Sequence, residues 1–253
     1  MSPAVTIVGI DCATKPRKTG LACGLWNLNQ LRIEDATLGQ LPRSGDAVVQ
    51  TILNWLPQTG SLLLAIDAPL GWPHGFGAAL AGHAAGDALD IDPSEFFNRH
   101  TDRHVQEKFG QRPLSVGADL IARTAAAALR LVDQLRKQIG NDIPLLWDPA
   151  SPFECGVIEV YPAATLRQTN APSTGYKEKE GPHKQTREKI VQTLQLGRIA
   201  EPDVIQSALD HADVLDACIC VLAGAHFLNG SSDPPPELTP EIKREGWIWV
   251  TRD

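Results

Sequence analysis

The first 38 residues contain three segments rich in apolar and β-branched side chains, at residues 5–10, 20–26 and 31–38. The connections between these segments are too short to hold a helix, so parallel crossovers cannot join them. We therefore expect an antiparallel meander of three strands. A simple Rossmann fold is disfavoured, because it needs a helix between each pair of its first strands.

The rest of the chain predicts helices and strands in alternation. Ser44 can cap the next helix and Pro57 ends it, whereas Gly140 closes a second, longer helix. A polar loop is expected over residues 165–183. The remaining expected elements are helices at 47–56, 115–139, 184–196 and 202–227, and strands at 62–66, 156–160 and 246–250.

This order of elements is that of an RNase H-like α/β fold. Such a fold has a mixed five-stranded sheet, with three antiparallel strands followed by parallel strands, flanked by helices. At 253 residues the chain is only slightly longer than a common α/β domain, so we predict one domain over residues 1–253. Residues 71–113 show no sustained period and are interpreted as an insertion or lid after the fourth strand.

Charge and composition restrict the function. The net charge is -7, which argues against a protein that coats nucleic acid nonspecifically, since such binding needs a basic surface. A nuclease is still allowed, because its centre is acidic and only its rim must be basic. The five scattered cysteines favour reduced, buried thiols over disulfides or a zinc site.

The sequence also predicts a cellular location. It contains no apolar run near the roughly 18 residues that span a bilayer. Its first residues, MSPAVTIVGI, lack the features of a signal peptide. We expect a cytoplasmic protein with no membrane association.

Some carboxylates occur in apolar stretches of the sequence, where burial of an ionised side chain costs free energy. Asp216 lies within residues 214–223, which are otherwise apolar, and Asp213 lies on the same predicted helix face three residues earlier. Asp11 and Asp67 each end a predicted strand, and Glu159 lies in the strand predicted at 156–160, so all three are expected at one sheet edge. Carboxylates that lie close together repel one another, and a bound cation offsets this repulsion. Their oxygen ligands suit Mg²⁺ or Mn²⁺.

Four strings resemble those of the DUF429 family, whose members are predicted to be RNase H-like nucleases of the ribonuclease H and Holliday-junction-resolvase superfamily. They are VGIDCATKP, LLLAIDAPLGWP, IEVYPAATL and DHADVLDACICVLAGAH, and the ending EGWIWV is also similar. The resemblance implies that Asp11 is the central metal ligand and that Asp67 is the second acidic residue. Asp213 and Asp216 are similar to the paired aspartates on the last helix of the resolvases.

The resemblance further implies a two-metal mechanism of phosphodiester hydrolysis on a nucleic acid. From its place at the same sheet edge, Glu159 is expected to be a further catalytic acid. The family's other acidic position often lies on the first helix, and residues 47–56 here contain no acid. DNA, RNA, hybrids and branched junctions all stay open as substrates. The expected substrate-binding residues are Arg99, Arg103, Arg123, Tyr161, Lys177 and Arg187, with Lys108, Arg112, Lys179 and Lys184 as further basic residues and Trp72 and Phe76 as stacking residues.

Two other functions fit parts of the sequence. GIDCAT resembles the first phosphate loop of sugar kinases and actin-like ATPases, but AIDAPLG does not supply their second glycine-rich loop. A non-catalytic RNase H-like module that binds nucleic acid or protein is the other alternative. In such a module Asp11 and Asp67 would serve only in turns, where aspartate after a strand is common.

Overall fold

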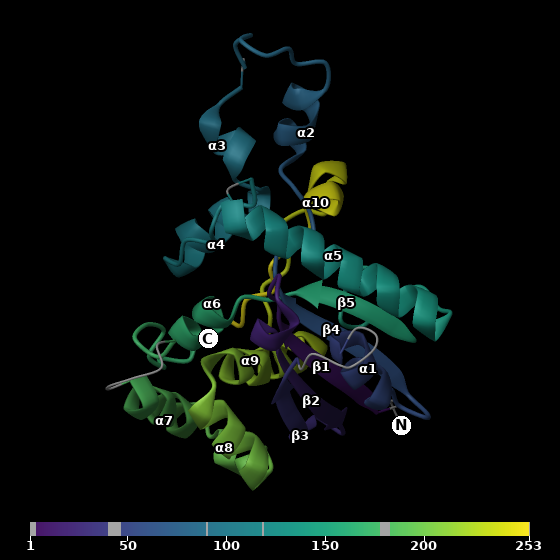
Figure 1. The fold of residues 1–253 in the computed structure, drawn as a ribbon, viewed down its shortest axis with the longest axis vertical. Helices are drawn as coiled ribbons and strands as arrows, with labels where there is room; N and C mark the ends of the chain where they lie inside the picture. Colours follow the sequence, from purple (N-terminus) through teal and green to yellow (C-terminus); the bar gives the residue numbers. More distant parts are fainter. Residues whose placement is uncertain (1–3, 40–46, 90, 118, 178–182, 253) are drawn as a thin grey trace.

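The computed structural model describes residues 4–39, 47–89, 91–117, 119–177 and 183–252. Its centre is a five-stranded sheet in the order β3-β2-β1-β4-β5 (Figure 1). The strands are β1 (Val5–Asp11), β2 (Gly20–Asn27), β3 (Gln30–Leu38), β4 (Ser61–Asp67) and β5 (Cys155–Glu159). β2 pairs in antiparallel fashion with both β1 and β3. β4 pairs in parallel fashion with both β1 and β5. The predicted α/β class with its RNase H-like mixed sheet is confirmed.

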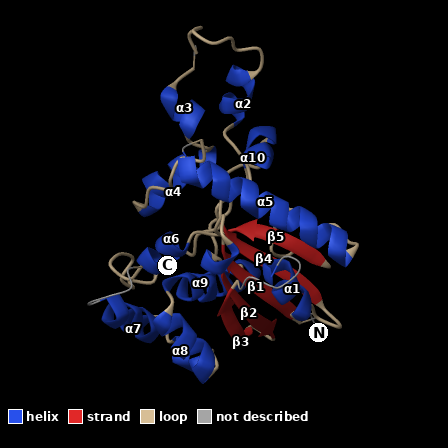
Figure 2. Ribbon diagram, viewed as in Figure 1, coloured by secondary structure: helices blue, strands red, loops and turns tan. Residues whose placement is uncertain are grey.

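Helices cover both faces of this sheet (Figure 2). On one face α1 (Ala47–Asn54) and α5 (Asp119–Ile139) share a core with Val8 and Ile66, and on the other α9 (Ala212–Leu228) shares a core with Ile7 and Leu63. Because side chains along a strand alternate between faces, β1 and β4 must be apolar at nearly every position. This explains the continuous apolar runs that end at Asp11 and Asp67.

Residues 71–113 contain three short helices, α2 (His74–Leu80), α3 (Pro93–Phe97) and α4 (His100–Phe109). In Figure 1, α2 and α3 project away from the sheet, beyond the end of α5. The short helix α10 (Pro240–Glu245) near the end of the chain contacts α2 and α4. The role of this segment as a lid stays a prediction.

Several predicted boundaries differ from the structure. The predicted loop over 165–183 overlaps α6 (Pro162–Gln168), which begins with a proline in its first turn. The predicted helix over 202–227 is two helices, α8 (Pro202–Asp210) and α9, because His211 is extended with φ −131° and ψ 115°. Instead of a strand at 246–250, Ile248 forms an isolated bridge to Glu159.

The other differences are smaller. The helix predicted over 115–139 begins at Asp119 as α5, and α7 (His183–Thr193) is followed by a 3-10 turn, η2 (Leu196–Arg198). A second 3-10 turn, η1 (Pro16–Lys18), lies between β1 and β2. The proposed helix cap Ser44 lies outside the described residues. In the part of the chain that the structure describes, no helix combines the length and apolarity needed to cross a bilayer.

Candidate acidic site

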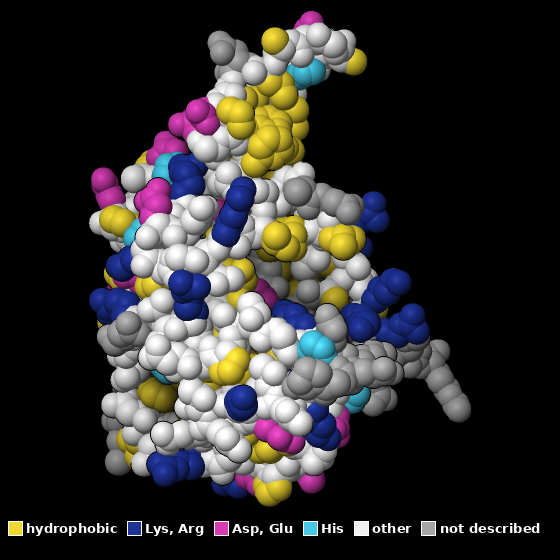
Figure 3. All heavy atoms as spheres, turned by 90° about the vertical axis from the view of Figure 1, so that its left-hand side faces the viewer, with side chains coloured by type: hydrophobic (Ala, Val, Ile, Leu, Met, Phe, Trp, Pro, Cys, Tyr) yellow, Lys and Arg dark blue, Asp and Glu magenta, His cyan; other side chains and the backbone are white. Residues whose placement is uncertain are grey.

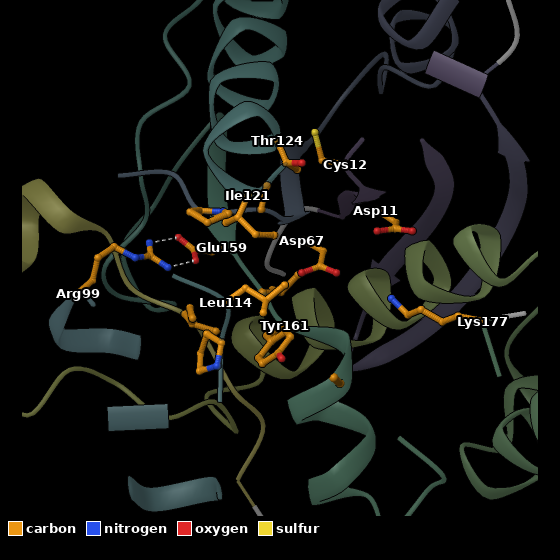
Figure 4. Close-up of a pocket in the computed structure, with 16 residues that line it drawn as sticks. Asp11, Cys12, Asp67, Arg99, Leu114, Ile121, Thr124, Glu159, Tyr161 and Lys177 are labelled. Atoms are coloured by element: carbon orange, nitrogen blue, oxygen red, sulfur yellow. Dashed lines mark hydrogen bonds and ion pairs between the residues drawn. The ribbon is translucent and has the colours of Figure 1, made fainter. Parts of the chain in front are cut away.

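Asp11 and Asp67 lie side by side at the carboxyl ends of β1 and β4. They are register partners in the parallel pairing, so the two strands end at the same level. Because side chains alternate, both follow Ile7 and Leu63 onto the face that α9 covers. Both line a cavity of about 380 Å³ that opens at this edge of the sheet (Figure 4).

Asp216 comes to the same place from α9, which packs unusually close to the sheet. A Cβ atom on Gly9 would lie 2.1 Å from the carbonyl oxygen of Ala217, so only glycine in β1 permits this distance. Gly20 of β2 likewise permits the close approach of α9, because a Cβ atom there would clash with the backbone of Asp213. The approach of the helix brings the buried Asp216 carboxylate within electrostatic range of Asp11.

Two consecutive residues hold the Asp216 carboxylate. The Tyr176 hydroxyl donates a hydrogen bond of 2.8 Å to its Oδ1, and the Lys177 Nζ lies 2.7 Å from its Oδ2. Apart from this ion pair, Oδ2 has no hydrogen-bond partner among the described residues. Lys177 therefore supplies the positive charge that a buried carboxylate requires.

The electrostatics of the site reflect crowding of negative charge. Burial raises the pKa of Asp11 well above its usual value, and the charges of Asp216 and Asp67 raise it further. Burial also raises the pKa of Asp67 to about 7, although the Lys177 ammonium opposes the increase. One ammonium does not compensate three carboxylates, so the cluster favours protons or further cations.

The donor set suits a hard divalent cation, because it consists of carboxylate oxygens. Among the described residues, however, no three His, Cys, Asp or Glu side chains are arranged as a ready metal site. The Lys177 ammonium lies against Asp216 Oδ2 and occupies that oxygen. A metal ion that took Asp216 Oδ2 as a ligand would have to displace Lys177.

Asp213 lies at the margin of this cluster. It is in the first turn of α9, its side chain is 33% exposed, and its closest ion-pair partner is Lys18, at 4.0 Å. Its charge nevertheless contributes to the raised pKa values of Asp11 and Asp216. The predicted pairing of Asp213 and Asp216 on adjoining turns is present, but only Asp216 is buried.

Glu159 and Arg99 were predicted as a catalytic acid and a substrate-binding residue, and the structure pairs them with each other. The two terminal nitrogens of Arg99 donate to the Glu159 carboxylate at 2.7 and 2.8 Å (Figure 4). Arg99 is 1% exposed and also binds Asp102. Glu159 is the register partner of Ile66, so it faces α5 rather than α9. The sequence suggested a catalytic acid and a substrate-binding residue. In the structure the two side chains instead form a buried ion pair at the cavity wall.

The other predicted substrate-binding residues are dispersed. Arg187 is buried and donates to the carbonyl oxygens of Leu209 and Tyr176, at 2.7 and 2.6 Å. It thus fixes the backbone before Lys177 and does not form part of the surface. Arg103 donates to the carbonyl of Asn98 at 2.9 Å.

Two predicted residues, Tyr161 and Lys177, line the open cavity. Arg123 does not line it; this residue is exposed on α5, the helix that contributes Ile121 and Thr124 to the lining. The sequence analysis did not single out the exposed side chains Lys15, Arg17 and Lys18, which lie four to seven residues after Asp11. Three basic residues in the short connection that follows an acid-ended strand were the available signal. Lys179 lies outside the described residues.

Comparisons with known proteins give a family without an assigned activity. A family model described as a protein of unknown function (DUF429) matches residues 9–241, which include all the acidic residues above. No curated protein and no solved structure matches the chain.

Proposed function

We propose that this chain, which belongs to the DUF429 family, is a metal-dependent nuclease that hydrolyses phosphodiester bonds of nucleic acid. The observation that carries the proposal is the convergence of Asp11, Asp67 and Asp216 from three separate segments beside an open cavity. Buried like charges are costly, and their retention in one place is typical of functional sites. The proposed ions are Mg²⁺ or Mn²⁺.

Asp11, Asp67 and Asp216 would hold the ions, with Asp11 between the other two and Asp213 as an outer acid. The ions would supply an activated water and stabilise the leaving oxygen, so no protein nucleophile is needed. Once released from Asp216, the Lys177 ammonium can neutralise a phosphate oxygen of the substrate. Tyr176 keeps its hydrogen bond to Asp216 Oδ1 and holds that carboxylate in orientation.

Phosphate contacts have to be local, because the whole chain carries a net charge of -7. Lys15 and Arg17 in the connection after β1 and Arg123 on α5 are exposed, and the face drawn in Figure 3 shows basic side chains scattered among uncharged ones. We propose these three, together with Lys177, as the residues that contact the sugar-phosphate backbone.

Incubation with labelled single-stranded, duplex, hybrid and branched nucleic acids in Mn²⁺ tests the proposal. The wild-type protein should cleave at least one of them, EDTA should abolish cleavage, and Asp11→Asn should lower the rate by about 100-fold or more. Asp133→Asn is a matched control, because Asp133 is exposed and pairs only with Lys137 in the described structure. Cleavage that persists unchanged in Asp11→Asn would refute the assignment.

A non-catalytic binding module is the second candidate, and the Lys177–Asp216 ion pair favours it, because it stabilises the buried acid without a metal. Titration calorimetry separates the two. Mn²⁺ binding that is lost in Asp11→Asn and in Asp216→Asn supports the nuclease, whereas absence of binding to the wild type supports the module. Thermal stabilisation by ATP would instead support a kinase or ATPase.

A further inference from the structure

The cavity beside the aspartates has a second, apolar end. Leu114, Ile121 and Tyr161 line the same space as Asp67 and Lys177. In Figure 4 these three side chains lie on the side of Asp67 that is away from Lys177. One cavity therefore joins a strongly charged end to an apolar wall.

Two side chains of this wall are available to a ligand. Leu114 is 68% exposed, an arrangement that leaves a large apolar surface in water at the cavity. Tyr161 is half-buried, and its hydroxyl forms long contacts of 3.4 Å with Gln111 and the Arg112 carbonyl. These contacts hold the hydroxyl while the ring remains part of the cavity lining.

We propose that this cavity takes one unpaired nucleotide of the substrate, with its phosphate beside Lys177 and the ions that Asp11 and Asp67 would hold, and its base against Leu114, Ile121 and Tyr161. The inference rests on the proposed nuclease function and adds a substrate class, namely a strand whose base at the cleavage site is unpaired. The volume of about 380 Å³ is at the lower end of the roughly 300–1,000 Å³ of small-molecule sites, which suits a single nucleotide.

The unpaired state follows from the shape of the site. Inside a duplex each base is stacked and paired, so its face reaches the cavity wall only after the base has left the stack. The lining residues Pro113, Leu114 and Ile121 offer no side-chain hydrogen-bond donor or acceptor to read a base edge. Contact with the faces of the bases is tolerant of sequence, so we expect little base preference.

Fluorescence anisotropy with labelled phosphorothioate oligonucleotides in Mg²⁺ tests this inference, because this hard cation binds sulfur poorly and the modified backbone then resists hydrolysis. The single strand should bind at least about tenfold more tightly than a fully paired duplex of equal length, as loss of base stacking predicts. Leu114→Ala and Tyr161→Ala should each weaken single-strand binding by about tenfold, and Tyr161→Phe, which keeps the ring, should retain it. Leu120→Ala is the matched control, because Leu120 is 63% exposed but does not line the cavity.

Mn²⁺ affinity, measured by calorimetry on the same variants, allows the nucleotide pocket and the nuclease function to be tested separately. Equal binding of single strand and duplex, or unchanged binding in Leu114→Ala and Tyr161→Ala, overturns the nucleotide pocket even if the wild type binds Mn²⁺ and cleaves. Selective binding that these variants weaken, in a protein that never cleaves, supports the pocket and overturns the nuclease. A wild type that binds neither Mn²⁺ nor oligonucleotide overturns both.

Discussion

Asp11 and Asp67 are register partners on adjacent parallel strands, and each is the last residue of its strand. Neighbouring strands are only about 4.8 Å apart, so the two carboxylates are held close by the backbone itself. Their proximity does not depend on flexible loops. The position of Asp216, by contrast, depends on how closely α9 packs on the sheet.

Replacement of Gly9 tests that dependence. Gly9→Ala would place a Cβ 2.1 Å from the carbonyl oxygen of Ala217, so α9 must move outward and carry Asp216 with it. We expect a loss of about 1–3 kcal/mol in unfolding free energy, as for other overpacked cores, and weaker Mn²⁺ binding. Urea denaturation and calorimetry measure the two effects. Gly197→Ala is the control, since nothing lies within 4 Å of its Cβ position, and equal behaviour of both variants would refute the argument.

Removal of the Lys177 ammonium should have opposite effects on stability and on metal binding. In the absence of metal, Lys177→Met leaves the Asp216 carboxylate without its ion-pair partner. Lys177 is 59% exposed, so screening reduces the expected loss to about 1 kcal/mol. Because the ammonium no longer competes, Mn²⁺ should bind more tightly and stabilise the variant more than the wild type.

Thermal melts with and without Mn²⁺ measure this difference. Lys184→Met serves as the control, because Lys184 pairs with the exposed Asp210. A Lys177→Met variant that Mn²⁺ stabilises less than the wild type would show that the lysine assists the metal instead of competing with it.

Glu159 should behave as a structural residue. Arg99→Met leaves the fully buried Glu159 carboxylate unpaired and should cost about 3–5 kcal/mol in unfolding free energy. The double variant Arg99→Met/Glu159→Met should recover part of this loss, which a double-mutant cycle by urea denaturation measures. The Mn²⁺ affinity of the folded protein should be unchanged in Glu159→Gln. A large loss of affinity in this variant would show that Glu159 belongs to the metal site.

Stability of the metal-free protein should fall as the pH rises. Burial raises the folded-state pKa of Asp67 to about 7, above the value of about 3.9 for an unfolded chain. The folded state thus binds this proton more tightly, so its contribution is complete below about pH 4 and is lost as the pH rises through 7.

Urea denaturation in EDTA from pH 4.5 to pH 8 gives this dependence, and Asp67→Asn should flatten it. Addition of Mn²⁺ at pH 8 should restore stability to the wild type. A wild-type curve parallel to that of Asp67→Asn would mean that Asp67 titrates normally.

The sequence was sufficient for the sheet because the apolar runs of β1 and β4 are buried on both faces and the early connections are short. It was insufficient for the break between α8 and α9. No proline or glycine stands between Pro202 and Gly224 to mark a break, and only the packing of α9 against β1 shows the change in direction.

The acidic site was predictable in part. Strand ends indicated Asp11 and Asp67, and an apolar context indicated Asp216. The edge position of Glu159 at the end of β5 agrees with the expectation, but its face was not predictable, because a shift of one position along β5 turns a side chain to the opposite face and the register with Ile66 is not visible in the sequence. The ion pair of Lys177 with Asp216 joins residues far apart in the chain, so no local pattern could predict it.

In the proposed nuclease, Asp11, Asp67 and Asp216 together bind a divalent cation that displaces Lys177. A crystal structure of the wild type with Mn²⁺, with anomalous diffraction data, would reveal such an ion. We predict an anomalous peak bounded by these three carboxylates, with the Lys177 Nζ no longer within ion-pair distance of Asp216. Crystals with saturating Mn²⁺ that show no peak there, and an intact Lys177–Asp216 ion pair, would contradict it.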